Sequence, residues 1–186
     1  MRPFLETARL TLRRFTMDDV DALYALGNDP RVTRFINGGK PVERAYLADD
    51  LLPHYLTYYE RFAHFGFWAA EERETGTFLG WFHYRPEEDA PADEPELGYR
   101  LKYAAWGRGY ATEGSLALLD KGFTEFGTRR VVAYTMAVNK GSRRVMEKIG
   151  MRFVRNFHED WAEAIEGAEH GEVEYAITRD EWPNRP

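Results

Sequence analysis

The sequence predicts a mixed α/β fold, with helices around a mostly antiparallel sheet that contains one parallel step. Strand-like and helix-like segments follow one another in the order strand, helices, three strands, helix, strand, helix, strands. The helical segment 112–126 stands between two strands and supplies the parallel step. The 186 residues are 44% hydrophobic and 15% aromatic, enough for one packed core, so a single domain over residues 1–186 is expected.

The first elements are a strand and a helix. Residues 8–15 alternate apolar and polar side chains, with Leu10 and Leu12 on one side, which is typical of a strand with one face in water. Thr16 then offers a side-chain oxygen as the N-cap of a helix whose apolar residues share one face. The turn-forming residues 27–30 end this helix.

The next segment is predicted to be helical with an interruption. A short helical piece covers 31–36, and a longer pattern of apolar residues at helical spacing runs from about 42 to 62. Pro53 lies inside this longer pattern and lacks a backbone donor. We therefore expect a kink or break near Leu52.

A hairpin and an exposed loop follow. Two aromatic strands at 65–70 and 77–84 are joined by a tight turn, which predicts a hairpin. Residues 86–95 contain three prolines and five acids, a composition that cannot form a core and predicts a solvated loop. Residues 96–102 alternate again and form the next predicted strand.

The C-terminal half alternates helices with strands. Residues 112–126 carry apolar side chains on one helical face, and residues 131–138 are apolar on both faces, as a central buried strand must be. A short helix then ends at Gly150. Two last strands, 151–157 and 172–178, enclose an acidic loop.

Charge and composition narrow the classes of partner. The formal net charge is −6, with acids concentrated in 86–96 and 159–174, which argues against a nucleic-acid partner and favours a basic or amine-bearing one. No apolar run approaches the ~20 residues of a membrane span, so no membrane partner and a cytoplasmic location are expected. There is no cysteine, and the five histidines show no metal-ligand spacing, so no metal site is expected.

The chemically informative segment is the turn at residues 106–112, between a strand and a helix. Backbone N–H groups at a helix N-terminus form an anion site, and Gly107, Gly109 and Ala111 leave room for a pyrophosphate. The side chain of Arg108 would add positive charge. A plain strand-to-helix turn, with glycines for geometry alone, is the other interpretation of these residues.

Two other phosphate-binding loops are excluded by spacing. A dinucleotide fingerprint that starts at Gly107 requires Gly or Ala at position 112, which is Thr112. A P-loop requires Gly-Lys-Ser/Thr, and Lys40 is followed by Pro41.

The turn resembles the acyl-CoA motif of the GNAT superfamily, Gln/Arg-x-x-Gly-x-Gly/Ala, with Gly109 and Ala111 in register. Trp106 replaces the Gln/Arg of the general pattern, and the local wording is similar to that of the RimJ/RimL-like branch of ribosomal-protein acetyltransferases. Residues 7–13 resemble the opening strand of that branch, and residues 139–151 resemble its Asn-x-x-Ser helix. The resemblance covers residues 7–180.

The resemblance implies a GNAT fold that binds acetyl-CoA (coenzyme A). Its sheet would have about seven strands, splayed between the fourth and fifth (96–102 and 131–138) by a bulge in the fourth. Backbone N–H groups near Leu101 and Tyr103 would hold the pantetheine, with Asn139 beside its amide. The pyrophosphate would lie on the turn, and Arg143 would reach the phosphates. The cofactor-binding residues implied in this way are Leu101, Tyr103, Gly107, Arg108, Gly109, Tyr110, Ala111, Thr112, Asn139, Ser142 and Arg143.

The catalytic groups are less well defined. Many GNAT enzymes use a Tyr acid seven residues after the Asn, where this chain has Met146. Ser142 resembles the serine that the ribosomal-protein branch is thought to use, although it could serve only as a helix N-cap. Glu96 and Glu159 are candidates for the general base, with Asp160 as another, and a solvated surface carboxylate is the alternative for each.

The expected activity is acetyl-CoA-dependent N-acetyl transfer to a primary amine of a protein N-terminus or a small molecule, by direct attack of the amine on the thioester. An acidic acceptor groove would favour basic amines. The alternative is a non-catalytic acyl-CoA-binding module, which the departure at Met146 leaves open. Homodimers are common in the resembled branch, so a homodimer of this chain is an expectation to test.

Overall fold

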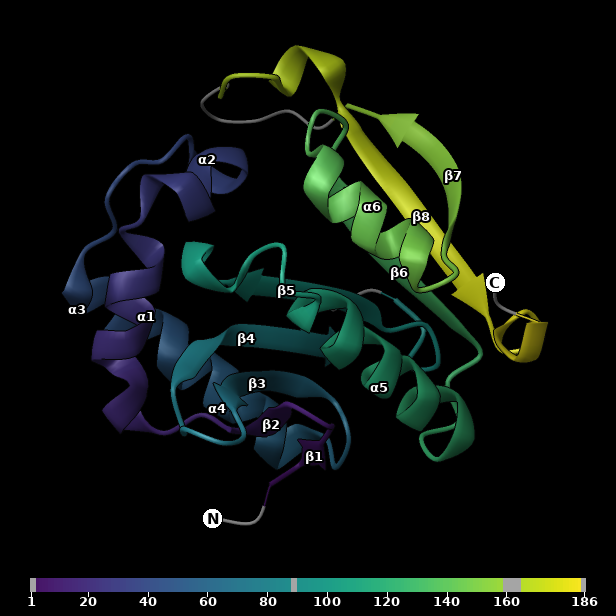
Figure 1. Ribbon diagram of the computed structural model, residues 1–186, viewed down its shortest axis with the longest axis horizontal. Helices are drawn as coiled ribbons and strands as arrows, with labels where there is room; N and C mark the ends of the chain where they lie inside the picture. Colours follow the sequence, from purple (N-terminus) through teal and green to yellow (C-terminus); the bar gives the residue numbers. More distant parts are fainter. Residues whose placement is uncertain (1–2, 88–89, 159–164, 185–186) are drawn as a thin grey trace.

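A computed structural model describes residues 3–87, 90–158 and 165–184. In these residues eight strands form one sheet, in the order β1-β2-β3-β4-β5-β6-β8-β7 (Figure 1). The strands are β1 (Leu5–Glu6), β2 (Leu10–Arg14), β3 (Gly66–Glu72), β4 (Phe78–Arg85), β5 (Glu96–Leu101), β6 (Arg130–Met136), β7 (Arg152–Phe157) and β8 (Glu172–Thr178). The sheet contains the seven expected strands and, in addition, β1, whose two residues are too few to show a period.

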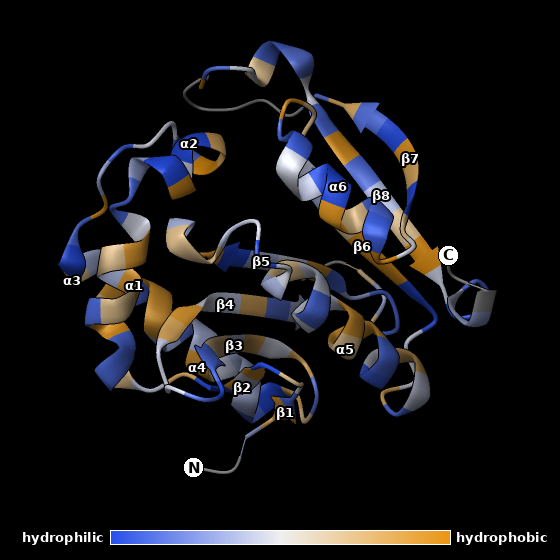
Figure 2. Cartoon of the chain, in the orientation of Figure 1, coloured by the Kyte–Doolittle hydropathy of each residue, from blue (hydrophilic) through white to orange (hydrophobic). Residues whose placement is uncertain are grey.

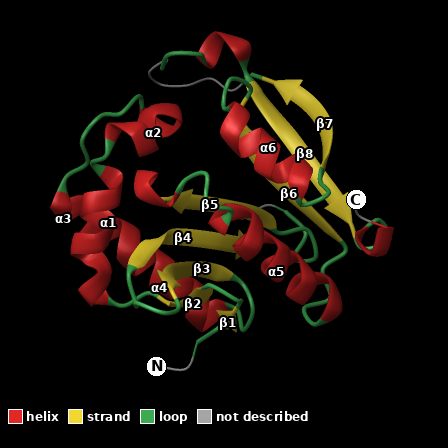
Figure 3. Ribbon diagram, viewed as in Figure 1, coloured by secondary structure: helices red, strands yellow, loops and turns green. Residues whose placement is uncertain are grey.

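The helices lie between these strands (Figure 3). They are α1 (Val20–Gly27), α2 (Pro30–Asn37), α3 (Arg44–Tyr46), α4 (Leu52–Arg61), α5 (Tyr110–Thr124) and α6 (Lys140–Lys148). The expected break near Leu52 is confirmed. A π-helical segment, Leu47–Leu51, ends there, and Pro53 falls in the first turn of α4, where a missing N–H costs nothing. None of the helices described is long and apolar enough to cross a membrane.

The sheet is antiparallel except at one step, as predicted. β5 and β6 are parallel, joined by the crossover that contains α5, and their only registered pair is Glu96 opposite Val132. Beyond this pair the two strands diverge, and Figure 1 shows β6, β8 and β7 as a group turned away from β1–β5. The splay between the predicted strands 96–102 and 131–138 is therefore confirmed.

The predicted cause of the splay is wrong. β5 pairs with β4 without a shift from Leu101 to Glu96, so β5 has no bulge in this pairing. The register shift lies one strand away, between β3 and β4, where Leu79 is the extra residue. Gly80 follows it, and a Cβ at this position would overlap the carbonyl of Arg100, so the bulged part of β4 lies very close to β5.

The sheet separates two apolar cores. Helix α5 packs on one face, over Phe82 and Tyr84 of β4, and it can approach closely because Gly114 and Gly122 face those rings without side chains. The helices α1 and α4 cover the other face, where the ring of Tyr55 stacks on Phe67 at 3.7 Å. Hydrophobic and hydrophilic residues alternate along α6, as expected for a helix with one side against the sheet (Figure 2).

Candidate active site

The turn at residues 106–112, called the glycine turn below, ends in the N-terminus of α5. Gly107 and Gly109 have φ of 71° and 83°, a left-handed conformation that favours glycine. Gly109 is the N-cap of α5, and no side chain caps the helix. The first intrahelical bond runs from Glu113 N to Gly109 O at 3.0 Å. The N–H groups before Glu113 therefore have no acceptor within the helix and are available to an anion.

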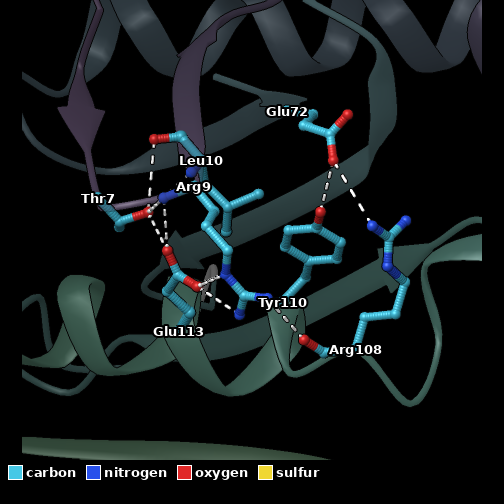
Figure 4. A network of polar contacts seen from close by, with 7 residues as sticks. All are labelled: Thr7, Arg9, Leu10, Glu72, Arg108, Tyr110 and Glu113. Atoms are coloured by element: carbon cyan, nitrogen blue, oxygen red, sulfur yellow. Dashed lines mark hydrogen bonds and ion pairs between the residues drawn. The ribbon is translucent and has the colours of Figure 1, made fainter. Parts of the chain in front are cut away.

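A network around Arg9 fixes the glycine turn to the start of the chain (Figure 4). The guanidinium of Arg9 donates to Glu113 Oε2 at 2.7 Å through Nε and to Arg108 O at 2.9 Å through Nη1. Thr7 Oγ1 donates to the other carboxylate oxygen of Glu113 at 2.6 Å. Arg9 and Glu113 lie inside the segments that resemble the family, but no sequence pattern pairs residues that are 104 positions apart.

The side chains of Tyr110 and Arg108 turn toward β3. Tyr110 Oη donates to Glu72 Oε1 at 2.6 Å, and this bond lowers the pKa of the Glu72 carboxyl. Arg108 Nη2 lies 3.8 Å from Glu72 Oε1 and its guanidinium is 5.2 Å from the centre of the Tyr110 ring. Arg108 was expected to add charge to the anion site, but its side chain is engaged by Glu72 and does not line the cavity described next.

A cavity of about 1220 Å³ opens where β5 and β6 diverge. The glycine turn, both diverging strands, α6 and part of α2 line it. The sequence-predicted site residues that reach its wall are Glu96, Leu101, Gly107, Gly109, Tyr110, Ala111, Thr112, Asn139 and Ser142. The structure thus brings predicted residues from three separate segments, β5, the glycine turn and the start of α6, to one cavity.

The backbone of β5 offers donors to this cavity. Lys102 N donates to Leu79 O at 2.8 Å, so Lys102, and every second residue before it, pairs with β4. The alternate residues Tyr99 and Leu101 therefore direct their N–H groups toward β6, which has already diverged. Leu101 was predicted to offer such a donor. Tyr103, predicted with it, lies outside the cavity wall, and its exposed ring packs against the guanidinium of Arg31 at 4.2 Å.

Two hydroxyl groups meet across the cavity. Tyr99 Oη lies 3.1 Å from Ser142 Oγ and donates to Ser142 O at 3.2 Å. Burial raises the pKa of Tyr99 to about 12, so its hydroxyl is neutral and can donate. The N-cap of α6 is Asn139, whose Oδ1 accepts from Ser142 N at 3.2 Å. The alternative role considered for Ser142, that of helix N-cap, therefore belongs to Asn139. Sequence reasoning missed Tyr99, which stands in a strand of alternating residues.

The comparison with known families identifies the fold. Residues 9–152 match the model of the acetyltransferase (GNAT) domain. The chain belongs to the GNAT acetyltransferase family. A relative from Aspergillus fumigatus, FsC-acetyl coenzyme A-N(2)-transacetylase, is 32% identical over 97% of this chain and 78% of its own length.

Solved structures agree with this assignment. A crystal structure of an acetyltransferase from Agrobacterium tumefaciens is 28% identical to this acetyltransferase, with 95% of each chain covered and a TM-score of 0.72. RimL, a ribosomal L7/L12 alpha-N-protein acetyltransferase in complex with coenzyme A, gives a TM-score of 0.79 over 95% of this chain and 98% of its own. Its identity is 16%, so the likeness to RimL concerns the fold alone.

Helix α6 of the acetyltransferase brings two arginines to cavity walls, the predicted Arg143 and its neighbour Arg144. Arg143 turns to the sheet, where it donates to Ala137 O at 3.0 Å and to Tyr175 Oη at 3.2 Å. Arg144 lines the large cavity together with Lys140 and Lys148. The same three side chains line an adjoining cavity of about 620 Å³ together with Arg143 and Glu147, so α6 presents its positive charge beside the glycine turn and the β5–β6 gap.

Glu96 lies on the cavity wall in an ionic cluster. Its Oε2 is 3.1 Å from Arg85 Nη2, and its Oε1 is 3.4 Å from His83 Nε2. Burial opposes ionisation of Glu96, but the neighbouring His83 and Arg85 outweigh it and lower the pKa to about 2. A carboxylate with so low a pKa binds a proton weakly at neutral pH, which makes it a poor base by itself. His83, whose imidazole lines the cavity, was not singled out from the sequence.

The remaining base candidates, Glu159 and Asp160, lie outside the described residues. The expected acidic groove is not what the described wall shows. Acidic side chains on this wall are Glu87, Glu96 and Glu172. Basic side chains are more numerous: Arg85, Arg100, Lys140, Arg144, Lys148 and Arg155. The net negative charge of the chain is therefore not concentrated in this cavity.

Proposed function

We propose that this acetyltransferase moves the acetyl group of acetyl-CoA to a primary amine by direct attack of the amine on the thioester. The observation that carries the proposal is the convergence of three features in one cavity: the uncapped glycine turn, the free-facing N–H groups of β5 and the Tyr99–Ser142 hydroxyl pair. The name of the A. fumigatus relative, an N(2)-transacetylase, supports an amino-nitrogen acceptor.

The cavity fits a coenzyme A molecule chemically. A Cβ at Gly107 would meet no atom within 4 Å, so the space in front of the turn is open to a diphosphate. The N–H groups at the start of α5 and the positive charges of Lys140, Arg144 and Lys148 complement phosphate groups. Acetyl-CoA, when bound, supplies the acetyl group as an activated thioester.

The residues of β5 would orient that thioester. Backbone N–H groups of Tyr99 and Leu101 would donate to carbonyl oxygens of the pantetheine and acetyl groups, the polarising role that preorganised donors fill in acyl transfer. Asn139 holds the first turn of α6 in place, because its side chain accepts from Ser142 N and donates to Thr135 Oγ1 at 3.0 Å.

Proton transfer would use groups on two sides of the cavity. On one side, His83 accepts a proton from the amine, and its Nε2 lies 3.4 Å from Glu96 Oε1. On the other, the hydroxyls of Ser142 and Tyr99 donate to the sulfur. With a pKa of about 12, Tyr99 is a weaker acid than a typical thiol of pKa ~8.5, so its contribution is a hydrogen bond to the thiolate. These hydroxyls would take the place of the tyrosine that many GNAT enzymes have at the position of Met146.

The test is cofactor binding followed by turnover. Calorimetry with coenzyme A should give saturable binding to the intact chain, and thiol release from acetyl-CoA should depend on an added amine from a panel of amino acids, polyamines and N-terminal peptides. No binding at millimolar coenzyme A would refute the proposal. Binding without turnover on any amine would favour the non-catalytic acyl-CoA-binding module.

A further inference from the structure

Arg100 is a cavity-lining cation without an anionic partner among the described residues. It lies on β5, and its guanidinium is 5.1 Å from the centre of the Trp81 ring. Its Nε is buried and makes no hydrogen bond with the described part of the chain. Trp81 therefore holds the side chain against the wall while the guanidinium remains available to the cavity.

The neighbouring arginines differ from Arg100 in this respect. Arg85 Nη2 is 3.1 Å from Glu96 and 3.2 Å from Glu87. Arg155 Nε is 2.7 Å from Glu174. Carboxylates of the protein neutralise both of these arginines. Arg100, on β5, has no such ion pair among the described residues.

A desolvated guanidinium without a counter-ion is unfavourable. Burial lowers the pKa of Arg100, but an arginine side chain stays protonated in proteins, so the charge persists. A partly buried charge without a counter-ion is destabilising, and a neighbouring anion offsets that effect. An anionic group of a ligand in the cavity would supply that compensation, and guanidinium matches a carboxylate with two parallel hydrogen bonds.

The position of Arg100 relates it to the transfer site. Arg100, Gly98 and Glu96 are alternate residues of β5 and share one face of the strand. Gly98 leaves space that the His83 ring fills, since a Cβ at Gly98 would lie 2.5 Å from His83 Cε1. At about 3.3 Å per residue, Arg100 and the Gly98–His83 position are roughly 7 Å apart along the strand. An amine at His83 and an anionic group at Arg100 can thus belong to one small molecule.

We propose that the acceptor is an amino carboxylate, an amino acid or close derivative, whose carboxylate binds Arg100 while its amino group faces His83. This inference rests on the proposed N-acetyltransferase function and narrows its substrate class. The same cavity is lined by Val32, Phe35 and Ile36 of α2, so the acceptor carries an apolar side chain.

The reaction balances without a further reactant. A bond forms between the amine nitrogen and the acetyl carbon, and the bond from that carbon to sulfur breaks. One proton leaves the amine for the protein base, which passes it to solvent, and the thiolate takes up one proton from solvent and is released as the thiol. The products are the N-acetyl amino carboxylate and free coenzyme A.

The experiment compares leucine, methionine and phenylalanine with their carboxamides as acceptors. For the native chain we expect a higher kcat/KM for each acid than for its amide. Arg100→Gln should reduce that preference about 10- to 150-fold, the range expected for hydrogen bonds to a charged group. Arg100→Lys should restore part of it, because the charge returns without the planar fork. Arg152→Gln, which removes an exposed arginine of β7 outside the cavity, is the control and should leave the preference intact.

The readouts separate this inference from the proposed function. Melting temperature and the calorimetric heat of coenzyme A binding are measured for each variant, so a misfolded protein is recognised. Turnover of amides equal to that of acids, or a preference unchanged in Arg100→Gln, overturns the carboxylate site while leaving the acetyltransferase intact. No turnover of any amine overturns the proposed function itself.

Discussion

The hydroxyl oxygen of Tyr99 lies 3.1 Å from Oγ of Ser142, which links β5 to α6 across the gap where the sheet has split. Since β5 and β6 share a single registered pair, this contact bridges the two halves on the far side of the opening. It also places two neutral donors beside the N–H groups of β5. The divergence that creates room for the thioester therefore also brings together the groups proposed to stabilise its sulfur.

The first prediction concerns this hydroxyl pair. We expect Ser142→Ala and Tyr99→Phe each to lower kcat by about 10²-fold with little change in KM for acetyl-CoA, because a hydrogen bond to the sulfur strengthens as negative charge develops there in the transition state. The double variant should lose less than the product of the two effects, since the hydroxyls serve one sulfur. Steady-state thiol release measures this, and unchanged kcat in both single variants would contradict it.

The second prediction concerns the glycine turn. Gly107→Ala should raise KM for acetyl-CoA, because a left-handed φ of 71° strains alanine and the methyl group enters the space assigned to the diphosphate. Gly76→Ala is a matched control. Its φ is 68°, and a Cβ there also meets nothing within 4 Å, but it lies in the β3–β4 turn away from the cavity.

Both alanine variants should lose a similar amount of stability, about 1 kcal/mol, in chemical denaturation. Only Gly107→Ala should weaken coenzyme A binding in calorimetry. Equal binding by both variants would show that the turn serves as chain geometry alone, the second interpretation that its sequence permits.

The fold could be predicted because its signals are local. Alternation at 96–102 and the continuous apolar run at 131–138 gave the two strands on either side of the parallel step, and Pro53 gave the break before α4. The bulge that the resemblance implied for the strand 96–102 is absent from its pairing with β4, and the register shift lies at Leu79 instead; a bulge depends on pairing between strands and leaves no period in either one.

The site could be predicted only in part. Glycines and Asn139 are typical of turns and helix starts, so their backbone positions could be predicted from the sequence. The structure has Gly107, Gly109 and Asn139 on the cavity wall. Side-chain direction on a helix is decided by packing: Arg143 and Arg144 are adjacent in sequence and both line the smaller cavity, but of these two only Arg144 lines the larger one. His83 and Arg100 became candidate site residues only because Glu96 and Trp81 lie beside them on the neighbouring strand. No pattern in a single sequence reveals such cross-strand neighbours.

The third prediction concerns acid stability. The folded-state pKa of Glu96, about 2, is below the ~4.3 of an unfolded glutamate, so the charged form favours folding. This contribution is fully present above pH ~4.3 and is lost as the pH falls toward 2. Glu96→Gln should therefore lower the free energy of unfolding at pH 7 and make it less dependent on pH between 5 and 3.

Urea unfolding at several pH values measures this effect. Glu74→Gln, at an exposed position in the β3–β4 turn, is the control and should keep the native pH dependence. A native slope in Glu96→Gln would mean that another carboxylate governs acid unfolding.

The fourth prediction concerns the close packing of α5 on β4, which positions the glycine turn. A Cβ at Gly122 would overlap the Tyr84 hydroxyl and lie 2.6 Å from its Cζ, so Gly122→Ala should cost about 1–3 kcal/mol of stability through overpacking. Tyr84→Phe removes the hydroxyl and with it the 3.0 Å hydrogen bond to Thr128 Oγ1, which should cost about 1 kcal/mol. The double variant should lose less stability than the two single variants together, because the phenylalanine relieves part of the overlap that the alanine creates. Denaturant unfolding of the four proteins gives this coupling energy, and strictly additive losses would show that α5 moves away from β4 instead. In that case the shift of the helix should also raise KM for acetyl-CoA, since the glycine turn is continuous with its first residue, Tyr110.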